Sequence, residues 1–168
     1  MFGYGSLLWR PGFQYHECMT ARICGWERRF WQGSPDHRGT PRRPGRVVTL
    51  VQAGDAGCTG KLYAVNEDHV EQVIRYLDHR ESGGYQRLWV TAHDNCGRRF
   101  RALTYVALPG NPHYLGPAAT VEMKAQIRAS KGPSGTNVDY CRMLHSAMSA
   151  LEVPDAEWHT LPLDGLLG

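Results

Sequence analysis

The clearest periodic pattern in the chain lies between residues 66 and 84. Apolar residues recur there at the i, i+3, i+4 and i+7 spacing that marks one face of a helix, namely Val70, Val73, Ile74 and Leu77. Asn66 is a favourable N-cap, acidic residues occupy the first turn, and the pair Gly83-Gly84 is typical of a helix end. We therefore predict a helix that begins after Asn66 and ends before Gly83.

Short runs of β-branched and aromatic residues, bounded by turn-forming residues, predict strands over the first two thirds of the chain. These runs are Met1–Tyr4, Ile23–Trp31, Val47–Gln52, Lys61–Val65, Tyr85–Ala92 and Arg99–Ala107. The last two flank Asp94-Asn95-Cys96-Gly97, which predicts a hairpin turn. The segment Gly33–Gly45 is rich in Pro and Gly and predicts a long ordered loop.

Helices dominate the predicted structure of the last third. We expect one helix over Ala118–Ser130 and, after a break at Gly132–Gly135, a second helix capped by Asn137. The second helix carries an apolar stripe formed by Cys141, Leu144, Met148 and Leu151. Early strands and late helices indicate an α+β fold, a small mixed β-barrel with flanking helices. No repeat or linker interrupts the chain, so we expect residues 1–168 to form a single domain.

Composition narrows the class of protein. With 42% hydrophobic and 21% charged residues, the 168-residue chain can bury a core, which excludes a disordered tail. No apolar stretch approaches the roughly 20 residues that span a bilayer, and Arg10 and Pro11 interrupt the early apolar run. We therefore expect no membrane partner and no signal peptide. The five cysteines are irregularly spaced, which favours reduced, mostly buried thiols in the cytoplasm over disulfides or a zinc site.

The net charge of +3 is low for a dedicated nucleic-acid binder, so we expect no nucleic-acid partner. Arginines nevertheless form two clusters: Arg38, Arg42, Arg43 and Arg46, then Arg98, Arg99 and Arg101. These clusters are consistent with a solvated face or with attraction of an anionic substrate. RNA binding, with stacking on Trp26, Phe30 and Trp31, is a third alternative, and no RNA-recognition signature accompanies it.

Several familiar catalytic and cofactor motifs fail in this sequence. Leu8 occupies the position of the third glycine of a dinucleotide loop, and Leu62 stands where a phosphate-binding loop needs Ser or Thr. Thr136 replaces the last glycine of a nucleophile elbow around Ser134. The eight histidines lack the spacing of metal ligands. We therefore expect no dinucleotide loop, no phosphate-binding loop, no metal site and no serine nucleophile.

Two features point to chemistry. A strand that breaks at Gly5-Ser6 exposes successive backbone N–H groups, which can bind a carboxylate or a phosphate; the alternative is an ordinary strand-to-loop turn. Glu81 stands at the end of the first predicted helix, where the negative end of the helix dipole and burial would raise the pKa of its carboxyl. A carboxyl of this kind suits proton transfer near neutral pH. The alternative is an exposed Glu81, or one paired with Arg80 or Arg87.

Together with other segments, these features resemble the ChaC-type γ-glutamylcyclotransferases, in particular the glutathione-specific branch. The matching segments are Phe2–Trp9, Arg28–Ser34, Asp36–Pro41, Pro44–Leu50, Tyr76–Tyr85, Tyr114–Pro117 and Gly132–Asn137. Their order and spacing cover nearly the whole chain. The short distance between Glu81 and the Gly83-Gly84 pair resembles the shorter of the animal-type variants.

This resemblance implies a reaction and a site. The reaction is cleavage of glutathione to 5-oxoproline and L-cysteinylglycine in the cytoplasm, without a metal or an organic cofactor. Glu81 matches the catalytic acid/base of the family. The substrate-binding loop corresponds to Gly3, Tyr4, Gly5, Ser6, Leu7 and Leu8. The oligomeric state stays open.

Other assignments also remain open at this level. Arg38 or Arg46 either pairs with a substrate carboxylate or fixes the long loop through backbone carbonyls. Three tyrosines either line the pocket or belong to the core: Tyr105, Tyr114 and Tyr140. A different class of function is a non-catalytic module that binds a γ-glutamyl ligand, although a pure binder has no evident need for Glu81.

Overall fold

A long antiparallel hairpin organises the sheet in the computed structural model, which describes residues 1–159 and 161–166. Strands β2 (Glu17–Ser34) and β3 (Gly45–Ala64) pair along almost their whole length. The sequence predicts two separate strands, Val47–Gln52 and Lys61–Val65, where the structure has the single strand β3. This strand is continuous because the backbone of residues 57–60 pairs with β2, which requires no β-branched side chains. Register shifts after Cys24 and Arg29 mark irregularities at which the paired strands bend.

Three further strands complete a five-stranded sheet with the order β1-β3-β2-β4-β5. They are β1 (Phe2–Gly3), β4 (Gln86–Asp94) and β5 (Arg99–Val106), and the last two form the predicted hairpin. The two ends of the sheet approach each other, since the Thr104 hydroxyl donates to the Phe2 carbonyl at 2.9 Å. The α+β class is confirmed. The sheet is curled and barrel-like, and its strand pairings within the described residues are all antiparallel rather than mixed.

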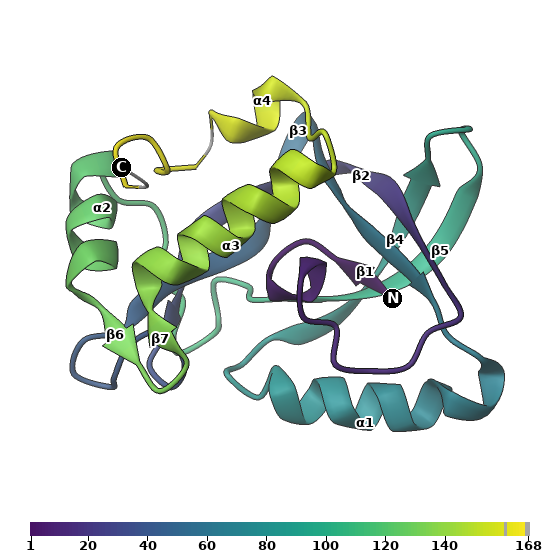
Figure 1. Cartoon of the computed structure of the whole chain (residues 1–168), viewed down its shortest axis with the longest axis horizontal. Coiled ribbons are helices and arrows are strands. Elements are labelled where there is room, and N and C mark those ends of the chain that lie inside the picture. The colour runs from purple at the N-terminus through teal and green to yellow at the C-terminus, as the bar shows by residue number, and fades with distance from the viewer. Residues whose placement is uncertain (160, 167–168) are drawn as a thin grey trace.

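Helices follow the predicted regions closely. They comprise the 3₁₀ turns η1 (Ser6–Leu8) and η2 (Glu67–His69) and the α-helices α1 (Val70–Arg80), α2 (Thr120–Ala129), α3 (Asn137–Ala150) and α4 (Asp155–Trp158). A small hairpin of β6 (Lys131–Gly132) and β7 (Gly135–Thr136) precedes α3. Figure 1 shows α3 running across β2 and β3, and α1 along the opposite side of the molecule. None of these described helices is both long and apolar enough to cross a bilayer.

The apolar stripe predicted on α3 forms part of the core. Cys141, Leu144 and Met148 are fully buried, in a cluster that also contains residues of β1, β2 and β3. The predicted cap of this helix is one residue off. Thr136 is the N-cap, because its hydroxyl accepts from the Asp139 amide. The buried Asn137 side chain instead bonds to β3, where it donates to the Arg46 carbonyl at 2.8 Å.

Arg28 lies almost fully buried in β2 and joins the C-terminal helix to the start of the chain. Its Nε donates to the Tyr4 carbonyl at 2.7 Å, and its Nη2 donates to the Thr59 carbonyl at 2.6 Å. Its Nη1 lies 3.6 Å from the carboxylate of Glu157 on α4, which also accepts from the amide and hydroxyl of Thr59. Buried charges require such pairing and hydrogen bonding, so this network fixes α4 against the sheet.

Candidate active site

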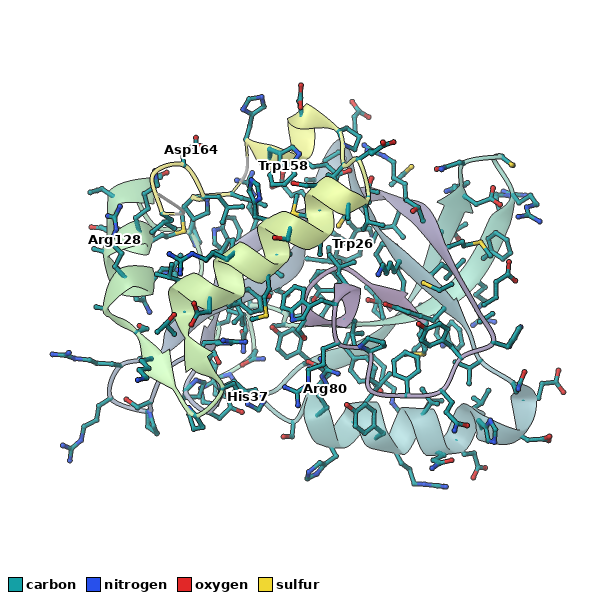
Figure 2. The ribbon with its side chains drawn as sticks, viewed as in Figure 1. Trp26, His37, Arg80, Arg128, Trp158 and Asp164 are labelled. Carbon is teal, nitrogen blue, oxygen red and sulfur yellow. The ribbon has the colours of Figure 1, made fainter. Side chains whose placement is uncertain are left out.

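A cavity of about 280 Å³ opens where segments far apart in the sequence meet. The segments are the loop after β1, residues 32–38, the C-terminal end of α1, and the β6–β7 hairpin with the start of α3. Figure 2 labels two of the lining residues: Arg80, the last residue of α1, and His37, which lies beside the β6–β7 hairpin. A concave site that combines apolar walls with several charged groups is the expected form of a small-molecule site.

The loop after β1 forms one wall through Tyr4, Gly5, Ser6 and Leu7. The 3₁₀ turn begins here, with the Leu8 amide donating to the Gly5 carbonyl at 2.9 Å. The amides of Ser6 and Leu7 precede this bond and have no acceptor within the turn, which is the arrangement that binds anions. A Cβ on Gly5 would lie only 3.1 Å from the side chain of Val48, so the tight packing behind the loop favours glycine.

Gly3 and Leu8, which the resemblance also assigns to substrate binding, do not line the cavity. Gly3 pairs with Lys61 in the ladder between β1 and β3. A Cβ there would come within 2.6 Å of the Leu7 Cβ, so this glycine permits the close turn. The Leu8 side chain is 1% exposed and belongs to the core. Both residues support the loop from behind.

Glu81 directly follows α1, and its carboxylate faces the cavity with 18% of the side chain exposed. Burial raises the pKa of this carboxyl above its ordinary value of 4.5; the Arg80 guanidinium opposes the shift, and Asp36 adds to it. Of the alternatives considered from the sequence, the pair with Arg80 exists, at 3.4 Å. Arg87 pairs instead with Asp78. Glu81 is therefore a half-buried carboxyl suited to exchange protons with a bound ligand.

Arg80 connects Glu81 with the loop after β1. Its Nη2 donates to the Ser6 hydroxyl at 2.8 Å, and its Nη1 donates to the carbonyls of Arg10 and Pro11 at 2.7 and 2.9 Å. The Arg80 guanidinium therefore links two walls of the cavity, the end of α1 and the loop after β1. The sequence analysis considered Arg80 only as a partner of Glu81, because nothing in the pattern predicts these contacts across about 70 residues.

Tyrosines form much of the remaining wall. Tyr105 and Tyr140 line the cavity, as does Tyr85, which the sequence analysis missed, whereas Tyr114 lies elsewhere, against Trp31. Burial is the main cause that raises the pKa of Tyr85 and Tyr140, so both hydroxyls stay neutral. Tyr85 donates to the Val48 carbonyl at 3.1 Å. The Tyr140 oxygen accepts from the Val48 amide at 3.3 Å, and among the described residues no acceptor takes its proton. Tyr140 can therefore donate to a ligand.

The structure distinguishes Arg38 from Arg46, whose roles the sequence left undecided. Arg46 is 6% exposed, and it donates to Gln126 and to the Phe30 carbonyl at 2.7 and 2.9 Å, away from the cavity. Its side chain therefore holds neighbouring segments together through the carbonyls of Phe30 in β2 and Gly116, and not through the loop 33–45. Arg38 lines the cavity. In the second arginine cluster, Arg98 pairs with Asp94 and Arg101 stacks 4.5 Å above the Trp89 ring, as expected of a solvated face.

Cysteines do not contribute to the cavity wall. All five are free, and the expectation that most are buried is wrong. Cys58 and Cys141 are buried, and burial raises the pKa of their thiols to about 11 and about 12. Cys18, Cys24 and Cys96 are exposed, because they lie on outward positions of β2 and in the β4–β5 turn. Residues 1–159 and 161–166 hold no group of three or more His, Cys, Asp or Glu suited to a metal ion.

Comparison with known proteins places this architecture in a family. The family model described as ChaC-like protein matches residues 1–164. A human protein named glutathione-specific gamma-glutamylcyclotransferase 1 is 44% identical over 153 residues, covering 88% of this chain and 68% of its own. Its zebrafish (Danio rerio) namesake is 40% identical over 161 residues, covering 94% and 82%. A crystal structure of a yeast gamma-glutamyl cyclotransferase specific to glutathione superposes with a TM-score of 0.85 at 30% identity, covering 99% of this chain and 92% of the other. By sequence and by fold, this chain belongs to the ChaC-like protein family.

Proposed function

We propose that residues 1–168 form one domain that cleaves glutathione into 5-oxoproline and L-cysteinylglycine. The observation that carries the proposal is the half-buried Glu81, which faces the loop Tyr4–Leu7 across a cavity of substrate size. The names of the relatives at 40–44% identity support the choice of glutathione. The five free cysteines suit a cytoplasmic location, which we also propose.

The substrate supplies its own nucleophile. Glu81 takes a proton from the α-ammonium of the γ-glutamyl residue, and the freed nitrogen attacks the γ-carbonyl carbon to close a five-membered lactam. The bond from that carbon to the cysteine nitrogen then breaks, and Glu81 returns its proton to the departing nitrogen. A second proton moves between the same two nitrogens through solvent, so Glu81 ends as a carboxylate. No step draws on a metal, an organic cofactor or a cysteine of the protein.

The cavity holds the substrate in the curled form that this reaction needs. The amides of Ser6 and Leu7 bind the α-carboxylate, and the Tyr140 hydroxyl lies available to the oxygen of the γ-carbonyl. Gly3 and Leu8 fix the loop from behind. Holding the reacting nitrogen and carbon together contributes up to about 7–11 kcal/mol in favourable intramolecular reactions.

Glu81→Gln tests the proposal, because the amide keeps the shape of the side chain and cannot take a proton. Acid–base catalysis of this kind contributes about 10²–10⁴-fold, so we expect a loss of that size in kcat while glutathione still binds. Products are followed by mass detection of 5-oxoproline and cysteinylglycine, and binding by calorimetry. Glu71→Gln is the matched control, since Glu71 lies on the exposed face of the same helix.

Two outcomes would contradict the proposal. Folded wild-type protein that leaves glutathione intact would exclude the activity. A Glu81→Gln variant that keeps more than about a tenth of the wild-type kcat would exclude Glu81 as the acid/base. A parallel reaction with γ-glutamyl-alanine measures how strictly the cysteinylglycine portion is required.

A further inference from the structure

Two arginines that line the cavity have no ion-pair partner within residues 1–159 and 161–166. Arg10 and Arg38 both line its wall, and within the described residues no carboxylate lies within 4.0 Å of either guanidinium. Arg38 donates through Nη1 to the Thr136 carbonyl at 3.2 Å and stands over the Tyr140 ring at 5.8 Å. These contacts orient the guanidinium and leave its other donors available to a ligand.

The electrostatics of this wall favour an anion. Burial lowers the pKa of Arg38, and the nearby positive charge of Arg10 lowers it further. Asp139 opposes this shift, but its carboxylate is already bound by Thr136 and Arg142. The partly buried Arg38 guanidinium has the positive charge of the exposed Arg10 nearby, so an anion bound beside it would be stabilised. A guanidinium with free donors binds a carboxylate through two parallel hydrogen bonds.

We infer that Arg38, assisted by Arg10, binds the carboxylate of the C-terminal glycine of glutathione and so sets the preference for the tripeptide. The inference rests on the proposed function. Glu81 at the end of α1 must lie beside the α-amine, which places the α-carboxylate near Arg80 and the Ser6 hydroxyl. The glycyl carboxylate is two residues beyond the reacting amide, a span of at most about 7 Å. Arg38 lines the same cavity as Glu81, from the side of the β6–β7 hairpin and α3, where it contacts Thr136 and Tyr140.

The test compares glutathione with an analogue whose glycyl carboxylate is a primary amide. The analogue keeps the α-amine, the α-carboxylate and the reacting bond. For wild-type protein we expect kcat/KM to be about 10- to 100-fold higher with glutathione, the range for a hydrogen-bonded charge pair. Arg38→Met should lower kcat/KM for glutathione by a similar factor and leave that for the amide unchanged. Arg38→Lys keeps the positive charge but cannot form two parallel hydrogen bonds to a carboxylate, so its kcat/KM for glutathione should lie between those of the wild type and Arg38→Met.

The matched control is Arg43→Met, which removes one positive charge from the same loop at an exposed position outside the cavity. Arg43→Met should leave kcat/KM unchanged for both substrates. Thermal unfolding reports whether each variant is folded. If Arg38→Met lowers kcat/KM equally for both substrates, Arg38 binds the α-carboxylate or has a structural role, and the inference is overturned. An unchanged kcat/KM for glutathione would overturn it as well. If Arg38→Met does not fold, Arg38→Lys decides by the same comparison. Wild-type protein that cleaves neither substrate would instead refute the proposed function itself.

Discussion

Replacing Arg28 with Met removes the centre of the buried network that joins α4 to the start of the chain. Met fills similar space but donates nothing, so the carbonyls of Tyr4 and Thr59 lose donors at 2.7 and 2.6 Å. The Glu157 carboxylate loses the buried Arg28 and keeps its pair with the more exposed Arg22 at 2.9 Å. Removing one partner of a buried ion pair costs about 3–5 kcal/mol. At this chain length 1 kcal/mol lowers Tm by about 2–4 °C, so we expect Tm to fall by about 6–20 °C.

Thermal and urea denaturation measure the effect against a control of the same chemistry. Arg75→Met removes an arginine from an exposed pair with Glu71 and should cost at most about 0.5 kcal/mol. The double variant Arg28→Met/Glu157→Gln should be less destabilised than the sum of its single variants, because each single variant already removes the Arg28–Glu157 pair, which the sum counts twice. Additive single variants, or an Arg28→Met cost within about 1 kcal/mol of the control, would refute the reasoning.

The same structure makes two further predictions. Because burial raises the pKa of Glu81, its ionisation opposes folding at pH values above that pKa and has no effect below its ordinary value of 4.5, where the carboxyl is protonated in both states. Glu81→Gln should therefore raise Tm at neutral pH and lose this advantage below pH 4.5; a Tm difference that does not depend on pH would contradict the assigned burial. A thiol reagent at neutral pH should label Cys18, Cys24 and Cys96 in the native protein, and should reach Cys58 and Cys141 only after denaturation. Rapid native labelling at Cys58 would show that the core opens locally.

The sequence predicts most of this fold because its signals are local. The periodicity at Val73 and Leu77 and the turn at Asp94–Gly97 act within a few residues, so the first long helix and the last hairpin follow from them. The continuity of β3 is not predicted, because the backbone of β2 supplies the pairing partner for its glycine-rich middle. The cap at Thr136 is missed for a similar reason, since the competing role of Asn137 depends on β3.

The site is predicted only where a motif is contiguous. Glu81 and the loop around Gly5 lie in segments that resemble a family, and the structure brings them to one cavity. The different roles of Arg38 and Arg46 cannot be predicted from the sequence, because they depend on contacts with distant segments. Arg38 donates to Thr136 in β7, and Arg46 donates to Gln126 on α2. Tyr85 is missed because its neighbours in the cavity come from β1, β3 and α3.

The contact between the two ends of the sheet has a consequence for folding kinetics. The Thr104 hydroxyl and the Phe2 carbonyl are separated by 102 residues, and β1 pairs with β3 about 60 residues away. Contacts of such high sequence separation form late, because the intervening chain must be ordered first. The loop that carries Tyr4 to Leu7 takes its position only when this closure is complete. Enzymatic activity should therefore return after helical and hairpin structure during refolding, which makes catalysis a reporter of the last folding step.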